Sequence, residues 1–233
     1  MDPCGGRYSL VRVGFVTIGQ SPRRDITEDL VKILPKDVEI VEAGALDDLS
    51  PSEIREKLSP KPGETLYVTR LRSGEEVRIS KEKIVGLIQE KISMLDNRGV
   101  DIIAILCSGE FPEFVSRTPI LYPDKILKGI VSGIKYRGKS AVLIPAKEQM
   151  EYARDKWSPY LEIPDIIPIS PYTSKSEDFS RVGLELRRIG AGLIVMDCMG
   201  YTMEQKIAIR GSNPGARIIT SRGALARALT ELL

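Results

Sequence analysis

The chain has 233 residues, of which 42% are hydrophobic, and this is enough to bury one large core or two smaller ones. Its 34 lysines and arginines nearly balance its 32 aspartates and glutamates, which argues against nucleic acid or an anionic membrane as a partner. The absence of histidine excludes Ser-His-Asp and Cys-His catalysis, HExxH zinc sites and imidazole acid–base chemistry.

In the first half of the chain, apolar runs of strand length alternate with stretches that repeat apolar residues at helical spacing. In chain order the pattern predicts a strand at 11–18, a helix at 22–34, a strand at 38–41, a helix at 51–58, a helix at 81–97 and a strand at 100–106. A capping box at Ser50 and Glu53 opens the short helix. A β-hairpin predicted over 66–79 interrupts the alternation and is a candidate lid or contact element.

The second half of the chain repeats this alternation. The predicted elements are a helix at 124–136, a strand at 140–144, a helix at 147–157, a strand at 163–169, a helix ending near 189, a strand at 192–197, a further helix, a strand at 217–220 and a C-terminal helix. Capping boxes at Ser174–Glu177 and Thr202–Gln205 open two of these helices. Repeated βα units favour an α/β fold with mainly parallel sheets.

Three features of the sequence bear on its location and cofactors. The first ten residues are polar and no apolar run approaches the ~18 residues of a membrane span, so we expect a cytoplasmic protein. The three cysteines form no Cys-x-x-Cys pair, which favours free thiols. Phosphate-loop, dinucleotide and GxSxG motifs are missing, so we expect chemistry without a cofactor or metal and a small molecule as the partner, with a homodimer left open.

Two cysteines occupy matching positions after buried strands. Ligands of open parallel sheets bind beyond the carboxyl ends of the strands, and Cys107 and Cys198 directly follow the strands at 100–106 and 192–197. Each is followed two residues later by a glycine, Gly109 or Gly200, which lets the backbone approach a ligand. A lone cysteine is more often a small core residue than a functional one. Because the two cysteines occupy matching positions, we give equal weight to the hypothesis that they form one functional site.

Two helix starts adjoin these junctions. The capped helix after Thr202 lies just beyond Cys198, and its dipole and free N–H groups are expected to favour a thiolate there. After the first strand, Ser21 as a helix cap and Arg23 form a candidate site for a carboxylate. The alternative, given equal weight, is that Ser21 only caps the helix and Arg23 is solvated.

Four segments resemble the AroM family: VGFVTIGQSPR, CSGEF, VLIPAKEQ with a following KW, and VMDCMGY. The resemblance extends from Arg12 to the C-terminus. The AroM family is similar to the Asp/Glu racemase superfamily, whose two pseudo-symmetric α/β lobes each bring one cysteine to opposite faces of a substrate α-carbon. The resemblance therefore implies a first lobe of residues 1–117 and 214–233 with Cys107, and a second of residues 118–213 with Cys198. It also implies that the C-terminal helix returns to the first lobe, with Leu225, Leu229 and Leu232 on one face.

In such racemases one thiolate removes the proton alpha to the carboxylate, and the opposite thiol delivers another. This chain departs from the glutamate type, in which Asn-Thr and Thr-His follow the two cysteines; here Ser-Gly follows Cys107 and Met-Gly follows Cys198. An acidic residue after the first strand is also replaced, by the segment TIGQ. These departures leave the amino-acid substrate open.

We therefore expect a cofactor-independent racemase or isomerase of a small carboxylate, with Cys107 and Cys198 as the acid–base pair. The predicted substrate-binding residues are Ser21, Arg23, Ser108, Gly109, Gly200, Tyr201 and Thr202. One alternative is a thiol-dependent lyase or decarboxylase on the same scaffold. Another is a carboxylate-binding or regulatory protein without catalytic activity.

Overall fold

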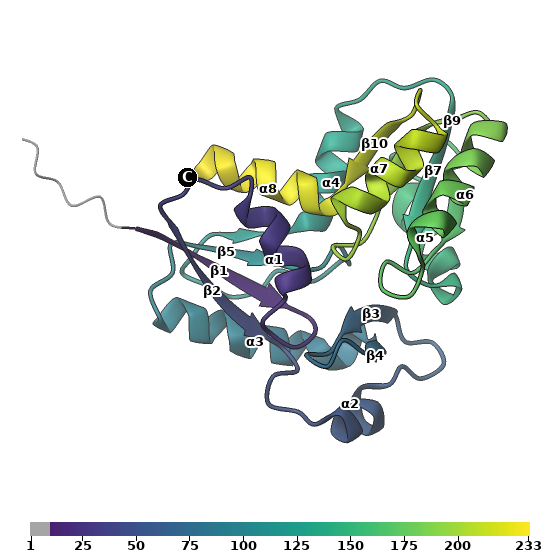
Figure 1. Ribbon diagram of the computed structural model, residues 1–233. Helices are drawn as coiled ribbons and strands as arrows, with labels where there is room; N and C mark the ends of the chain where they lie inside the picture. Colours follow the sequence, from purple (N-terminus) through teal and green to yellow (C-terminus); the bar gives the residue numbers. More distant parts are fainter. Residues whose placement is uncertain (1–9) are drawn as a thin grey trace, which may run out of the picture.

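The computed structural model describes residues 10–233, which form two four-stranded parallel sheets and a two-stranded antiparallel hairpin (Figure 1). The first sheet contains β2 (Val38–Gly44), β1 (Val11–Thr17), β5 (Ile102–Ile105) and β6 (Ile120–Leu121), in that order. The second contains β8 (Asp165–Pro168), β7 (Lys139–Ile144), β9 (Ala191–Met196) and β10 (Arg217–Thr220). The hairpin pairs β3 (Leu66–Arg70) with β4 (Glu76–Ser80). Most of the polar N-terminal stretch discussed above, including Cys4, lies outside the described residues.

The helices connect these strands in chain order. They are α1 (Arg24–Val31), α2 (Pro51–Leu58), α3 (Lys81–Asn97), α4 (Pro123–Ser132), the 3-10 turn η1 (Lys147–Gln149), α5 (Met150–Trp157), α6 (Ser176–Arg188), α7 (Met203–Ser212) and α8 (Ser221–Leu232). Among residues 10–233, no helix is both long and apolar enough to cross a membrane.

The two sheets have the same strand order when the second is followed from β8 to β10. The strand orders are β2-β1-β5-β6 and β8-β7-β9-β10. In the first sheet β1 lies between β2 and β5, and in the second β7 lies between β8 and β9. This arrangement makes β5 the counterpart of β9. The predicted α/β fold with two pseudo-symmetric lobes and mainly parallel sheets is confirmed.

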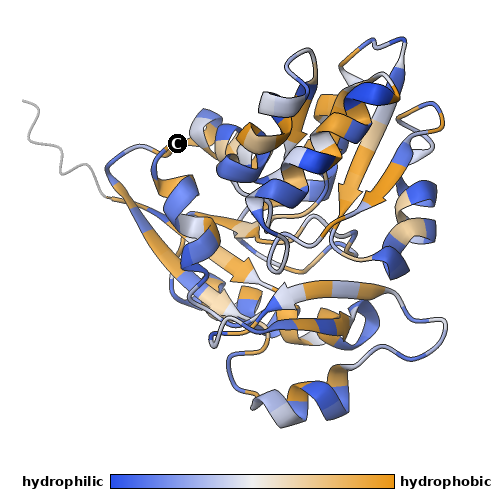
Figure 2. Ribbon diagram, turned by 45° about the vertical axis from the view of Figure 1, so that its right-hand side comes forward, coloured by the Kyte–Doolittle hydropathy of each residue, from blue (hydrophilic) through white to orange (hydrophobic). Residues whose placement is uncertain are grey.

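Helices cover both faces of each sheet. Helix α3 packs on one face of the first sheet and α1 and α8 on the other, while α4 and α5 face α6 and α7 across the second. Double coverage explains why strands such as β5 and β9 are apolar nearly throughout, as their orange colour in Figure 2 shows. The ends of β5 and β9 therefore lie inside the molecule, which determines where the residues that follow them lie.

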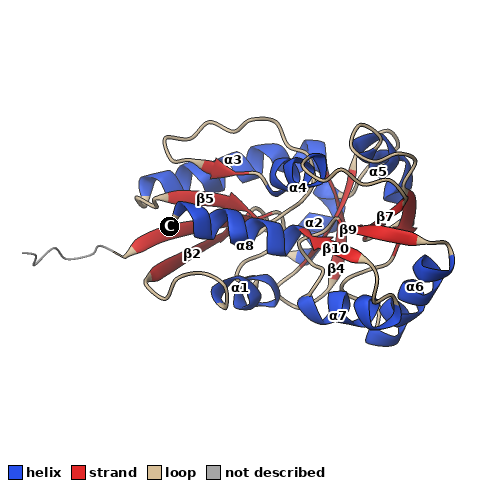
Figure 3. Cartoon of the chain, turned by 90° about the horizontal axis from the view of Figure 1, so that it is seen from above, coloured by secondary structure: helices blue, strands red, loops and turns tan. Residues whose placement is uncertain are grey.

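The C-terminal helix α8 joins the two lobes. Leu225 and Leu229 are buried in the cluster that contains Phe15 of β1, and Figure 3 shows the helix lying along the first sheet. Leu232 is 58% exposed, so its predicted place on the buried face is wrong. Strand β10 pairs with β9 in the second sheet, and the chain reaches the first sheet with α8.

Some predicted helix starts are confirmed and others are wrong. The capping boxes at Ser50 and Thr202 are present. Helix α6 instead has Lys175 as its N-cap residue, whose N–H donates to the Asp178 carboxylate at 2.8 Å, because the helix begins one residue later than the predicted box requires. Helix α1 begins at Arg24 without a side-chain cap, so the predicted capping role of Ser21 is also wrong.

Candidate active site

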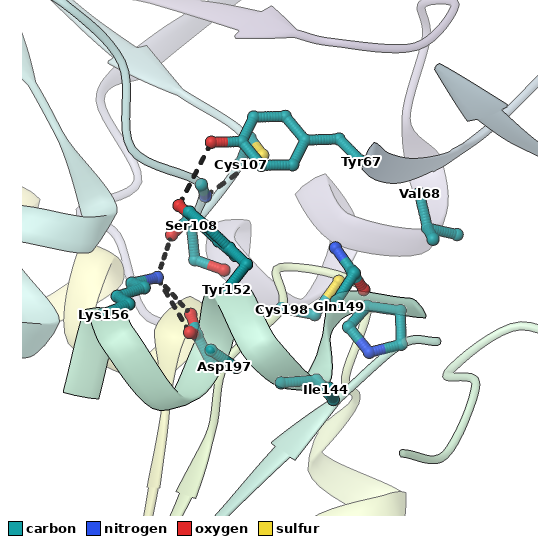
Figure 4. A pocket seen from close by; sticks show the side chains of 13 residues that line it. Tyr67, Val68, Cys107, Ser108, Ile144, Gln149, Tyr152, Lys156, Asp197 and Cys198 are labelled. Atoms are coloured by element: carbon teal, nitrogen blue, oxygen red, sulfur yellow. Dashed lines mark hydrogen bonds and ion pairs between the residues drawn. The ribbon is translucent and has the colours of Figure 1, made fainter. Parts of the chain in front are cut away.

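The thiols of Cys107 and Cys198 line the same cavity. Cys107 follows β5 of the first sheet and Cys198 follows β9 of the second, so the equivalent ends of the two sheets meet there (Figure 4). The remaining lining residues include Tyr67, Val68, Ser108, Gly109, Ile144, Pro145, Gln149, Tyr152, Ala153, Lys156 and Asp197. The cavity has a volume of about 30 Å³, which holds a few water molecules at most.

Each sulfur accepts a hydrogen bond from the backbone N–H of the glycine two residues later. The Gly109 N–H donates to Cys107 Sγ at 3.3 Å, and the Gly200 N–H donates to Cys198 Sγ at 3.3 Å. Hydrogen bonds from N–H groups favour the thiolate form of a cysteine. The Cys-x-Gly spacing noted in the sequence thus gives both thiols an equivalent donor.

Burial keeps both thiols protonated in the closed cavity. It raises the pKa of Cys107 to about 12 and that of Cys198 to about 11, although the glycine N–H groups lower both. The expectation that the start of α7 favours a thiolate at Cys198 is therefore wrong, because loss of solvation outweighs the nearby donors. A charge on Cys198 further raises the pKa of Cys107, so ionisation of one sulfur helps to keep the proton on the other.

These raised pKa values predict slow alkylation at neutral pH. Because only the thiolate reacts, the rate for each cysteine should rise about tenfold per pH unit from pH 7 to pH 10. Iodoacetamide labelling followed by peptide mass spectrometry measures the rate at both sites; a plateau of the rate near pH 8.5 would contradict the prediction.

The raised pKa values also make the stability of the fold depend on pH. An unfolded thiol has a pKa of about 8.5, so the stability gained from the raised pKa values is complete below pH 8.5 and declines as the pH rises towards 11 and 12.

A buried ion pair adjoins both thiols. The Lys156 ammonium group, at the end of α5, donates to the two carboxylate oxygens of Asp197 at 2.8 and 3.0 Å and to the Ser108 carbonyl at 2.6 Å. The Trp157 indole N–H donates to the same carboxylate at 2.7 Å. Sequence reasoning did not place Lys156 and Asp197 in the site. The available signals were the Lys156-Trp157 pair in a family-like segment and the position of Asp197 directly before Cys198.

The hairpin supplies one wall of the cavity. The Tyr67 hydroxyl, from β3, donates to the Glu110 carbonyl at 2.8 Å and lies 3.3 Å from the Tyr152 hydroxyl. The Gln149 side chain of the second lobe donates to the Leu66 carbonyl at 3.1 Å, so the hairpin also contacts the opposite lobe. The hairpin of the first lobe therefore covers the thiols and touches both sides of the site.

Replacing Gly109 with alanine should destabilise the protein. A methyl group there would overlap the Tyr67 ring, whose hydroxyl is held by Glu110 and Tyr152, and such overpacking costs about 1–3 kcal/mol. The control is Gly86→Ala in α3, where nothing lies within 4 Å of the added methyl group and a gain of about 0.5–1 kcal/mol is expected. Urea denaturation compares the two variants, and equal changes in midpoint would contradict the packing argument.

The predicted carboxylate ligands do not line the thiol cavity. The Ser21 hydroxyl donates to the Asp47 carboxylate at 2.7 Å. Arg23 is buried and donates to both carboxylate oxygens of Asp25 at 2.9 Å, and to the Tyr172 hydroxyl at 3.2 Å. Contact between a substrate carboxylate and these two residues stays a prediction, and it requires Asp47 and Asp25 to release them.

The other predicted site residues divide into two groups. Ser108 and Gly109 line the cavity beside Cys107. On the Cys198 side, Gly200 packs under Tyr172, the buried Tyr201 hydroxyl donates to the Ile169 carbonyl at 2.7 Å, and Thr202 caps α7. The structure therefore brings Ser108 and Gly109 to the thiols, while Gly200 supports Cys198 through its N–H group.

Comparison with known proteins identifies relatives in family and fold. A family model described as AroM protein matches residues 13–233. No curated protein matches the chain at a significant level.

Among the solved structures that share the fold are three racemases. An aspartate racemase from Picrophilus torridus has 18% identity and a TM-score of 0.58, with 95% of this chain and 94% of that chain covered. An allantoin racemase from Klebsiella pneumoniae has 14% identity and a TM-score of 0.61, with 95% and 87% covered. A glutamate racemase from Aquifex pyrophilus has 16% identity and a TM-score of 0.55, with 96% and 84% covered. The expected Asp/Glu racemase-like fold is confirmed.

Proposed function

The chain belongs to the AroM family, and from this membership, its racemase-like fold and the two cysteines that line one cavity we propose that it is a cofactor-independent racemase or isomerase of a small carboxylate. Cys107 and Cys198 are proposed as its acid–base pair. The racemases of similar fold have low identity to this chain, so the proposal depends on the site itself.

One observation carries the proposal: two thiols from equivalent strands of the two lobes line a single cavity, and each accepts an equivalent glycine N–H. Inversion by a two-base mechanism places a base on one face of the carbon and an acid on the other, and two like groups can exchange these roles. In a chain without histidine, a pair of cysteines supplies groups of matched pKa for this purpose.

The proposed reaction begins with one cysteine as thiolate and the other as thiol. The thiolate takes the proton from the substrate α-carbon, so that the C–H bond breaks, an S–H bond forms and the electron pair remains on the substrate. The opposite thiol gives its proton to the other face of that carbon and becomes the thiolate. The glycine N–H groups stabilise whichever sulfur is charged.

Substrate binding has to enlarge the cavity. The volume of about 30 Å³ between the thiols is too small for a carboxylate of amino-acid size. A cleft of about 730 Å³ lies between β4 of the hairpin and the second lobe and shares Pro145 with the thiol cavity. We propose that the substrate reaches the thiols from this cleft when the hairpin and the second lobe separate.

A ligand screen with turnover tests the proposal. Small carboxylates that have an acidic α-proton are screened for thermal stabilisation, where a hundredfold excess over Kd gives about 2.7 kcal/mol. Single enantiomers of each stabilising compound are then followed by polarimetry, with the Cys107→Ser, Cys198→Ser double variant as control. Loss of optical rotation with the wild type alone is the expected result. Stabilisation without turnover would favour a binding protein, and release of carbon dioxide would favour a decarboxylase; either outcome would overturn the proposal.

A further inference from the structure

One ammonium group contacts the neighbours of both thiols. Lys156 donates to the carbonyl of Ser108, the residue after Cys107, and to the carboxylate of Asp197, the residue before Cys198. Figure 4 shows Lys156 between these two partners. The two catalytic loops proposed above are therefore connected through a single side chain.

This connection spans the two lobes. Ser108 lies in the loop after β5 of the first sheet, whereas Lys156 and Asp197 belong to elements of the second. The bond from Lys156 to Ser108 can exist only while the two loops are together. Separation of the lobes would break it and leave the ammonium group attached to Asp197 alone.

The degree of burial distinguishes this pair from the surface ion pairs. The side chains of Lys156 and Asp197 are 1% and 5% exposed. Among the ion pairs of the described residues, this is the one in which both side chains are less than 10% exposed. A buried ion pair contributes little net stability compared with apolar residues of similar volume. Its contacts with the residues next to both thiols therefore indicate a further role.

We propose that Lys156, which contacts the loops of both thiols, is a positioning residue whose ammonium group supplies the positive charge that favours ionisation of Cys107. The catalytic part of this proposal rests on the proposed function. The electrostatic part concerns the thiols themselves and can be tested without a substrate.

The charges of Lys156 and Asp197 have opposite effects on the pKa of Cys107. The Lys156 ammonium lowers the pKa of Cys107, whereas the Asp197 carboxylate raises the pKa of both thiols. Among the other ionisable groups, Tyr67 and Tyr152 line the cavity beside Cys107, and Tyr172, Tyr201, Arg23 and Arg222 interact electrostatically with Cys198. Removing the ammonium alone should thus suppress the thiolate at Cys107, and removing the carboxylate alone should favour the thiolate at both cysteines.

A purely structural role predicts a different result. If Lys156 acted only as a structural contact, by filling space or by joining the two loops, Lys156→Gln would loosen the site and expose both thiols, and both would react faster. The electrostatic role predicts slower reaction at Cys107. The direction of the change therefore separates the two explanations.

The experiment measures iodoacetamide labelling of each cysteine between pH 8 and pH 10, resolved by peptide mass spectrometry. The variants are Lys156→Gln, Lys156→Arg, Asp197→Asn and the double variant Lys156→Gln, Asp197→Asn, with circular dichroism to verify folding. At pH 9 we expect labelling of Cys107 to be at least threefold slower in Lys156→Gln and at least threefold faster in Asp197→Asn. Lys156→Arg and the double variant, which keep the same net charge as the wild type, should remain within about twofold of it.

Faster labelling of both cysteines in Lys156→Gln, or an unchanged rate at Cys107, would overturn the proposal. If Lys156→Gln fails to fold, the rates in Asp197→Asn and in Lys156→Arg decide: an unchanged rate in the first or slower labelling of Cys107 in the second would contradict it. The result is independent of turnover. Failure of the racemase proposal would appear in the polarimetric screen and leave these labelling rates as they are.

Discussion

Serine in place of Cys107 or of Cys198 is expected to stop inversion of the substrate, with a loss of about 10²–10⁴ in kcat for each variant. In the proposed mechanism each thiol serves one face of the α-carbon, and a serine hydroxyl is far too weak an acid to replace it. The two sulfurs line one cavity and have equivalent hydrogen bonds, so neither is expected to be dispensable. Polarimetry with each enantiomer of the substrate measures the effect.

The double variant Cys107→Ser, Cys198→Ser provides the control for this prediction. Because residues that act as a unit have non-additive effects, it should lose no more activity than either single variant. Full activity in one single variant would favour a decarboxylase or lyase that needs one thiol. Full activity in both would exclude the cysteines from the chemistry.

Alanine in place of Asp197 is expected to lower the free energy of unfolding by about 3–5 kcal/mol. The substitution leaves the Lys156 ammonium buried without its counter-charge and removes the acceptor of the Trp157 indole N–H. The urea denaturation midpoint, with the slope unchanged, measures the loss.

The exposed pair between Arg55 and Glu75 provides the comparison for Asp197. Both side chains there are about half exposed, so Glu75→Ala should shift the midpoint very little. A shift for Asp197→Ala as small as that for Glu75→Ala would mean that the buried pair contributes nothing beyond a surface ion pair.

The strands and the place of the thiols could be predicted because they depend on local pattern. Apolar runs such as Ile102–Ile105 and Ala191–Met196 mark strands covered on both faces, and the residue after each such strand lies at the ligand-binding edge of a parallel sheet. The Cys107 and Cys198 positions follow from this reasoning together with the family resemblance. Strand β6 has only two residues, which is too short for a pattern of alternating or continuous apolar residues, so the sequence did not predict it.

The polar partners could not be predicted, because they come from distant parts of the chain. Ser21 is bound by Asp47, 26 residues away, and Lys156 is bound by Asp197, 41 residues away. Sequence spacing shows that a serine can cap a helix, but it does not show which carboxylate competes for its hydroxyl. The raised pKa values of the thiols also follow from burial in the folded site, which a capping box near Cys198 does not reveal.

The central claim is that two thiols act on opposite faces of one carbon, and hydrogen exchange with deuterated water tests it most directly. The wild-type protein is supplied with one enantiomer of a substrate in deuterated water, and both enantiomers are analysed at low conversion. The account predicts deuterium at the α-carbon of the product enantiomer and protium in the recovered starting enantiomer, because a different sulfur serves each face. Deuterium appearing equally fast in the recovered enantiomer, or inversion without any deuterium in the product, would contradict it.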